Sequence, residues 1–136
     1  MSLYRSTSAS TDLKTDEFYD GLVEVAYWRK FNALHKWFVD NLQGGVDDCS
    51  YYEVKKQHLN DLFELLTKVN SLNPKYTGIP VNEEELEQLL PTQPGFFFGG
   101  ISYDERYFYD VDNAITQVKN LLDIGEFENL YYNSSW

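Results

Sequence analysis

Residues 28–38 carry the side chains best suited to binding chemistry. In an α-helix, at about 100° per residue, Arg29, Asn32 and Lys36 share one sector with apolar side chains, and His35 lies beside them. Buried polar groups need hydrogen-bonding partners, and a buried charge needs a counter-charge. Two interpretations stay open. Either these side chains form an internal polar network, or they line a cleft in which Arg29 clamps an anionic or polar ligand.

The candidate ligand-binding set extends beyond this stretch. Its members are polar or charged side chains that would converge on the same ligand: Arg29, Asn32, His35, Asp47, Asp48, Gln93 and Asp104. In the alternative network, Arg29 pairs with an internal acid, for which the candidates are Asp47, Asp48, Asp104 and Asp110.

The triplet Asp47-Asp48-Cys49 follows a diglycine and precedes a predicted helix. Together with His35 or His58 it has the ligand types of a metal site, and Cys49 with His35 has those of a nucleophile pair. Neither spacing is diagnostic, and two acids before a helix typically complement its dipole. The chain also lacks a phosphate-binding loop and a dinucleotide fingerprint. We therefore favour binding over catalysis and predict no catalytic residue, metal or cofactor.

An aromatic loop at residues 92–100 contains three consecutive phenylalanines between glycines and prolines. Such a segment is not an ordinary solvated loop. It is either pinned by its own aromatic rings or forms a binding lip, and a short strand is compatible with the pattern. Together with aromatic residues near the C-terminus, the loop supplies the candidate partner-binding residues: Phe96, Phe97, Phe98, Tyr131, Tyr132 and Trp136.

The elements that position these residues are predicted to be helices. Apolar residues recur at a period near 3.6 over residues 16–42, and a diglycine follows. Ser50 and Glu53 have capping-box spacing, which predicts a second helix ending by Pro74. Asn82 begins a short third helix. The last helix carries an apolar stripe and ends at Gly125. We therefore predict an all-α domain of four helices over residues 15–136, preceded by a flexible arm at 1–14.

Composition narrows the functional classes. The 136 residues are 43 % hydrophobic and 17 % aromatic, with one cysteine and a net charge of −11. Residues 76–136 hold 11 acids but only Arg106 and Lys119 as bases, so direct nucleic-acid binding is not expected. The acidity serves either solubility or the docking of a basic partner. No apolar run is long enough to span a bilayer and no signal peptide is visible, so we expect a cytosolic protein without membrane contact.

Four blocks of sequence, WRKFNALHKWFV, GGVDDCSYY, LLPTQPGFFFGG and YDERYFYDV, together resemble a group of small proteins encoded by tailed bacteriophages and prophages. That group has no established activity, so the resemblance implies a setting rather than a mechanism. It implies expression in the cytoplasm of an infected bacterial host. It also implies that the seven candidate ligand-binding residues belong to one motif set.

Three functional hypotheses follow. The first is an acidic phage accessory protein that binds a host or defence protein, in one version as a nucleic-acid mimic, and it predicts an exposed aromatic patch rimmed by acids. The alternative is a binding protein, or minimal enzyme, for a nucleotide-like or anionic small molecule, and it predicts a concave site at Arg29 beside the aromatic loop. The third is a structural component of the virion. The chain has more aromatic residues than one small core must bury, which is also compatible with homo-oligomerisation.

Overall fold

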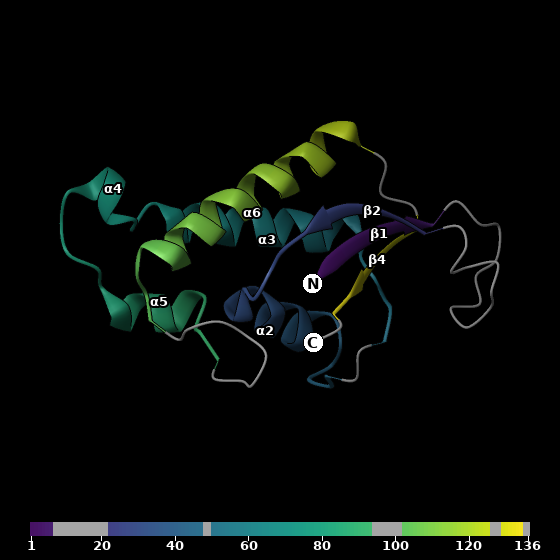
Figure 1. The fold of residues 1–136 in the computed structure, drawn as a ribbon, viewed down its shortest axis with the longest axis horizontal. Helices are drawn as coiled ribbons and strands as arrows, with labels where there is room; N and C mark the ends of the chain where they lie inside the picture. Colours follow the sequence, from purple (N-terminus) through teal and green to yellow (C-terminus); the bar gives the residue numbers. More distant parts are fainter. Residues whose placement is uncertain (7–21, 48–49, 94–101, 126–128, 135–136) are drawn as a thin grey trace.

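The fold is mixed α/β, which corrects the all-α prediction. The computed structural model describes residues 1–6, 22–47, 50–93, 102–125 and 129–134, and these contain five helices and a four-stranded antiparallel sheet (Figure 1). In chain order the elements are β1 (Ser2–Ser6), β2 (Leu22–Tyr27), α2 (Asn32–Asn41), β3 (Tyr52–Glu53), α3 (Lys56–Asn70), α4 (Pro74–Thr77), α5 (Glu83–Leu89), α6 (Glu105–Ile124) and β4 (Leu130–Asn133).

The sheet joins the two ends of the chain. Its strand order is β2-β1-β4-β3, so the first and last strands are neighbours at its centre, with Leu3 opposite Tyr132. Residues 2–6 of the expected arm are therefore a central strand, and residues 7–14 lie outside the described residues. The sequence offered no local signal for this pairing, because each strand is short and its partner is distant along the chain.

The predicted first helix is wrong over residues 22–27, which form β2 and pair with β1. Val23, Val25 and Tyr27 are residue types that favour strands, and pairing with β1 overrides the helical spacing of the apolar positions. The helix itself begins only at Asn32, after Lys30 adopts a left-handed backbone with φ of 54°. The earlier part of the predicted helix, residues 16–21, lies outside the described residues.

The predicted cap of the second helix is also wrong. Instead of starting that helix, Tyr52 and Glu53 form β3 and pair with β4. The helix α3 begins at Lys56, and the backbone N–H of Lys55 donates to Nδ1 of His58 at 3.0 Å. The long-range ladder with β4 thus takes precedence over the local capping spacing at Ser50.

The last two predicted helices are confirmed. The Asn82 side chain accepts a hydrogen bond from the Glu85 N–H at 3.2 Å, as an N-cap at the start of α5 requires. Gly125 ends α6 in the left-handed conformation, with φ of 75°. Both helices have strong caps next to their own termini, and this is why local sequence located them.

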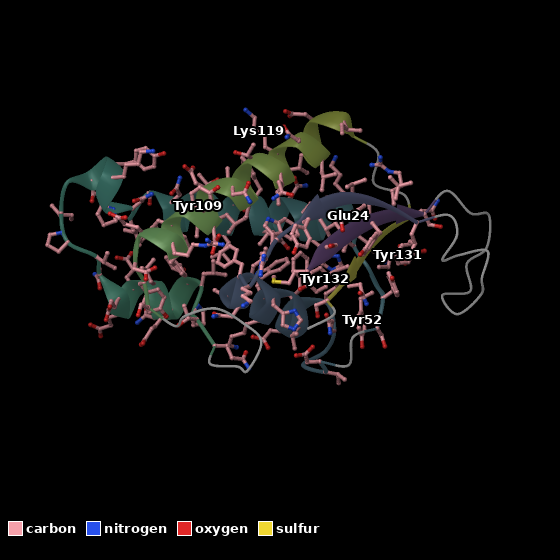
Figure 2. All side chains as sticks on the ribbon, viewed as in Figure 1. Glu24, Tyr52, Tyr109, Lys119, Tyr131 and Tyr132 are labelled. Carbon is pink, nitrogen blue, oxygen red and sulfur yellow. The ribbon has the colours of Figure 1, made fainter. Side chains whose placement is uncertain are left out.

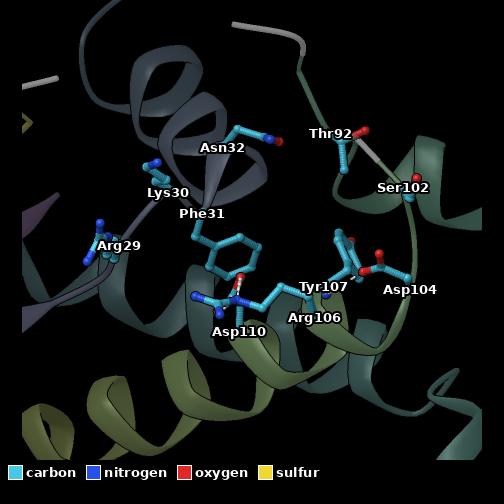
Figure 3. A pocket seen from close by; sticks show the side chains of 10 residues that line it. All are labelled: Arg29, Lys30, Phe31, Asn32, Thr92, Ser102, Asp104, Arg106, Tyr107 and Asp110. Atoms are coloured by element: carbon cyan, nitrogen blue, oxygen red, sulfur yellow. Dashed lines mark hydrogen bonds and ion pairs between the residues drawn. The ribbon is translucent and has the colours of Figure 1, made fainter. Parts of the chain in front are cut away.

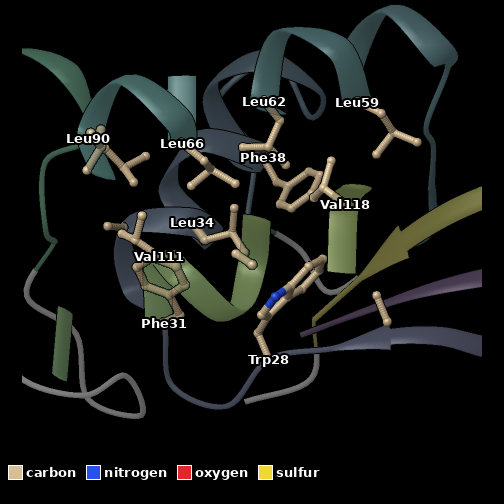
Figure 4. Packing of buried hydrophobic residues seen from close by; sticks show 14 of the residues in the cluster. Trp28, Phe31, Leu34, Phe38, Leu59, Leu62, Leu66, Leu90, Val111 and Val118 are labelled. Carbon is tan, nitrogen blue, oxygen red and sulfur yellow. The ribbon is translucent and has the colours of Figure 1, made fainter. Parts of the chain in front are cut away.

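The core lies where α2, α3, α6 and the sheet meet. In Figure 1 the long helices α3 and α6 lie side by side, α3 leading away from the sheet and α6 leading back to it. Buried apolar side chains of the three helices and of Phe31, the N-cap of α2, pack together (Figure 4); those in the helices include Leu34, Phe38, Leu62, Leu66, Val111 and Val118. Phe38 also stacks on Tyr132 of β4 with ring centroids 3.9 Å apart. No helix in the described ranges has an apolar stretch that could cross a membrane.

One side chain of α6 fixes the end of β2. The Gln117 amide accepts from the Tyr27 N–H at 2.9 Å and donates to the Tyr27 carbonyl at 3.0 Å. Because β2 is an edge strand, these two bonds take the place of a further strand at that position. They also hold the connection from β2 to α2 in a fixed place relative to α6.

Candidate functional site

An open pocket of about 350 Å³ lies where the β2–α2 connection faces the start of α6 (Figure 3). We call it the anion pocket, and it is defined by the residues that line it: Arg29, Lys30, Phe31, Asn32, Thr92, Ser102, Asp104, Arg106, Tyr107 and Asp110. Three of these side chains are basic and two are acidic. Two of the three arginines in this acidic chain line the pocket.

Arg29 and Lys30 are exposed cations on the wall of the pocket. Neither makes an ion pair or hydrogen bond with any residue in the part of the chain that the structure describes. Of the acids considered as partners for Arg29, the described ones, Asp47, Asp104 and Asp110, make no ion pair with it, and Asp48 lies outside the described residues. An unpaired guanidinium at a pocket wall presents its planar donors to a ligand carboxylate or phosphate.

The N-terminus of α2 adds to this positive end of the pocket. Its N-cap is Phe31, no side chain caps it, and its first turn contains no acid. By contrast, α4, α5 and α6 are capped by the side chains of Asn73, Asn82 and Asp104. The positive end of the α2 dipole therefore lies beside Arg29 and Lys30 without an acidic side chain to offset it.

The left-handed backbone at Lys30 is an unusual conformation for a residue with a side chain. Its φ of 54° costs about 1 kcal/mol relative to an ordinary helical or extended conformation. The strain falls on the residue that joins Arg29 to the start of α2. The fold thus holds the two cations at the pocket in a conformation that the isolated peptide would avoid.

The floor of the pocket is rigid and aromatic. The rings of Phe31 and Tyr107 meet edge to face, with centroids 6.2 Å apart, and both are buried. The Tyr107 hydroxyl donates to the Leu90 carbonyl at 2.7 Å, and burial raises the pKa of Tyr107 far above its ordinary value. Tyr107 is therefore a neutral structural donor.

Asn32 links the pocket to the segment that follows α5. Its side-chain oxygen accepts a hydrogen bond from the Gln93 N–H at 3.0 Å, and Asn32 is 5 % exposed. Both residues belong to the predicted ligand-binding set, and the contact between them is made through the Gln93 backbone. The neighbouring Thr92 N–H donates to the Tyr103 hydroxyl at 3.2 Å. These bonds hold Thr92 at the edge of the pocket.

The third basic residue of the pocket is already paired. Nε of Arg106 lies 3.2 and 3.3 Å from the two carboxylate oxygens of Asp110, one helical turn later. The Asp110 side chain is 14 % exposed and that of Arg106 is 65 % exposed. Burial raises the pKa of Asp110, while the Arg106 charge and hydrogen bond lower it and nearby Asp104 raises it further.

His35 belongs to a separate buried cluster, the His35 network, formed by His35, Asp47, Tyr132 and Ser134. Nδ1 of His35 lies 2.6 Å from the Tyr132 hydroxyl, and Nε2 lies 3.0 Å from an Asp47 carboxylate oxygen. The Nε2–Asp47 contact has the distance of an ion pair but not hydrogen-bond geometry, since Nε2 makes no hydrogen bond with a described residue. Burial and Asp47 raise the pKa of Tyr132, and a hydrogen bond from Ser134 opposes them.

The predicted ligand-binding residues therefore divide into two groups. Arg29, Asn32 and Asp104 line the anion pocket, and Gln93 contacts it through Asn32. His35 and Asp47 form the His35 network and do not line the pocket. Asp48 lies outside the described residues.

Sequence reasoning missed part of the pocket. Lys30, Arg106, Thr92 and Ser102 were not predicted to bind ligand, and Asp110 was considered only as a partner for Arg29. One signal was available for Arg106 and Asp110, because a basic and an acidic residue four positions apart pair on a helix.

The predicted partner-binding tyrosines are not available to a partner. Tyr132 is 0 % exposed and Tyr131 is 7 % exposed, because both lie in the central strand β4 (Figure 2). Phe96, Phe97, Phe98 and Trp136 lie outside the described residues. The described tyrosines that are more than half exposed are Tyr27, Tyr76 and Tyr109.

Comparison of the chain with protein-family models, with curated proteins and with solved structures gives no match. Within the described ranges, no three His, Cys, Asp or Glu side chains are grouped so as to hold a metal ion. The case for a function therefore rests on the chemistry of the anion pocket.

Proposed function

We propose that this protein binds a small anionic molecule in the anion pocket. The observation that carries the proposal is the pair Arg29 and Lys30, two cations that line a concave site without counter-charges among the described residues. This was the alternative hypothesis from the sequence, and a concave site lined by Arg29, Asn32 and Asp104 supports it, whereas His35 does not line that site and the phenylalanines of the aromatic loop lie outside the described residues. The resemblance to phage proteins supports a role for this binding in the cytoplasm of an infected bacterium.

Three physical effects favour an anion at the basic end of the pocket. Each exposed ion pair with Arg29 or Lys30 contributes about 0.2–1 kcal/mol. The uncapped N-terminus of α2 contributes about 0.3–1 kcal/mol more at low salt. These are modest energies in an open site, so binding of a bare anion is expected to be weak and to weaken further as salt is added.

A nuclear magnetic resonance titration of the full chain with inorganic pyrophosphate tests the proposal. We expect the largest amide shifts at Asn32, Ala33 and Leu34, whose N–H groups begin α2, and at residues 102–107. The shifts should decrease at high salt. Saturable changes confined to elements away from the pocket would contradict the proposal.

Variants that remove positive charge distinguish binding in the pocket from a general effect of the protein's net charge. The double variant R29Q/K30Q should weaken pyrophosphate binding about 2- to 30-fold, because two exposed ion pairs of about 0.2–1 kcal/mol each are lost. The matched control K55Q/K56Q removes the same charge from two adjacent lysines at the start of α3, where they do not line the pocket. Equal weakening in both variants would show that only net charge matters, and the proposal would fail.

Binding to a host or defence protein remains a second candidate. The observation that favours it is the exposure of three tyrosines, since aromatic side chains anchor many interfaces. Replacement of Tyr27, Tyr76 and Tyr109 by serine should abolish retention of a host protein that the native chain binds in an infected lysate. Retention unchanged in the triple variant would remove these tyrosines as the interface.

A further inference from the structure

We infer that the ligand is amphoteric, with an anionic group at Arg29 and Lys30 and a primary ammonium group at Asp104. This inference rests on the proposed function and names the class of molecule that the same pocket takes. It follows from the way charge is distributed along the pocket and from the unused hydrogen-bonding capacity of Asp104.

The pocket has two ends of opposite character. Figure 3 shows Arg29 and Lys30 on one side, and Asp104 with Thr92 and Ser102 on the other. The paired Arg106 and Asp110 lie between these ends and largely neutralise each other. A ligand that extends from one end to the other therefore meets positive charge first, and then a carboxylate with two hydroxyl groups.

The Asp104 carboxylate can accept a further hydrogen bond from a ligand. One of its carboxylate oxygens accepts the Tyr107 N–H at 3.2 Å and thereby caps α6. The side chain is exposed and makes no ion pair with a described residue, because Arg106 pairs with Asp110 instead. An ammonium group can donate to the other oxygen without disturbing the cap.

A cationic group at this end also relieves a repulsion that is already present. Asp104 is close enough to Asp110 that its negative charge raises the Asp110 pKa. A second anionic group placed here would add to that repulsion, whereas an ammonium group would offset it. The acidic end thus discriminates against molecules that are negatively charged at both ends.

Matched phosphonates test this inference with the full chain. Aminomethyl-, aminoethyl- and aminopropylphosphonate are compared with methyl-, ethyl- and propylphosphonate by calorimetry or by the amide shifts of α2. The best aminoalkylphosphonate should bind up to about five-fold more tightly than its alkyl counterpart, which is the upper end of the range for one exposed charge pair.

The variant D104N should abolish this gain. Asparagine caps helices as well as aspartate does, so α6 keeps its start while the charge is lost. The control E105Q removes an acid from the adjacent position, which does not line the pocket, and should retain the gain. Alkylphosphonate affinity in D104N should increase slightly, because the anion then meets one negative charge fewer in the pocket.

The outcomes separate the two proposals. If alkyl- and aminoalkylphosphonates bind equally, or if the gain persists in D104N, the amphoteric ligand is ruled out while anion binding stands. If neither phosphonate series binds and R29Q/K30Q does not weaken pyrophosphate binding, the proposed function itself is overturned.

Discussion

The anion pocket and the His35 network both place polar side chains of one short segment, residues 29–35, next to the same apolar core. In the His35 network the polar groups lie against one another: Ser134 hydrogen-bonds to Tyr132, the Tyr132 hydroxyl lies 2.6 Å from Nδ1 of His35, and Nε2 of His35 lies 3.0 Å from Asp47. In the anion pocket Arg29 and Lys30 line an open concavity and have no counter-charge among the described residues. The difference shows that polar residues of similar type on one stretch can serve either stability or binding, according to whether the fold completes their bonds.

The largest effect should come from breaking the His35 network. The variant H35A leaves the Tyr132 hydroxyl and Asp47 without this partner and creates a cavity beside Phe38, so it should lower the free energy of unfolding by about 2–4 kcal/mol. Urea denaturation measures the loss.

The matched control is H58A. His58 is only partly buried and accepts one hydrogen bond from the Lys55 N–H, so its loss should cost about 0.5–2 kcal/mol, the range for a helix cap. If H35A costs no more than H58A, the His35 network does not stabilise the fold, and the contrast with the pocket is lost.

Replacement of Lys30 by glycine is expected to give a smaller change in the free energy of unfolding, of opposite sign. Glycine tolerates positive φ, so K30G should stabilise the fold by about 0.5–1 kcal/mol while weakening anion binding. K30Q keeps the strain and removes only the charge, so it should weaken binding without stabilising the fold. Thermal unfolding and pyrophosphate titration of both variants measure the two quantities. A K30G protein less stable than K30Q would show that the backbone at this position is not strained.

The smallest effect should be the contribution of Asp110 to the pH dependence of stability. Burial raises its pKa in the folded protein above the ordinary value of 3.8, so between these two values the folded state binds more protons than the unfolded state. Stability should therefore decrease as pH rises through this range and level off above the raised pKa. D110N should lack this part of the slope, whereas E105Q should keep it. Urea unfolding at a series of acidic pH values measures this dependence. If the free energy of unfolding of D110N depends on pH in the same way as that of the native chain, the burial of the Asp110 carboxyl is contradicted.

Local sequence identified those parts of the fold that are stabilised locally. Asn82 and Gly125 act within one turn of the helices they cap, so these helix ends were predictable. The strands were not, because β1 is defined by its pairing with residues at the other end of the chain. Residues 22–27 show the same limit, since their apolar spacing fits a helix and only the contact with β1 makes them a strand.

The candidate site was predicted in part for the same reason. Arg29 and Asn32 were identified because they interrupt an apolar pattern within one segment. Arg106 joins them only because the start of α6 packs against the β2–α2 connection, which no local pattern encodes. The sequence also could not separate His35 from Arg29, because the partner that distinguishes them, Tyr132, lies in β4.

The central place of β4 has a consequence for the order of events during synthesis. Strands β1 and β2 leave the ribosome early and can form a hairpin, but the position beside β1 stays empty until residues 130–133 emerge. Until then the apolar faces of Leu3 and Phe38 lack Tyr132 as their cover. The nascent chain therefore presents an incomplete sheet while residues 28–129 are synthesised, and an open strand edge is then exposed to wrong pairing.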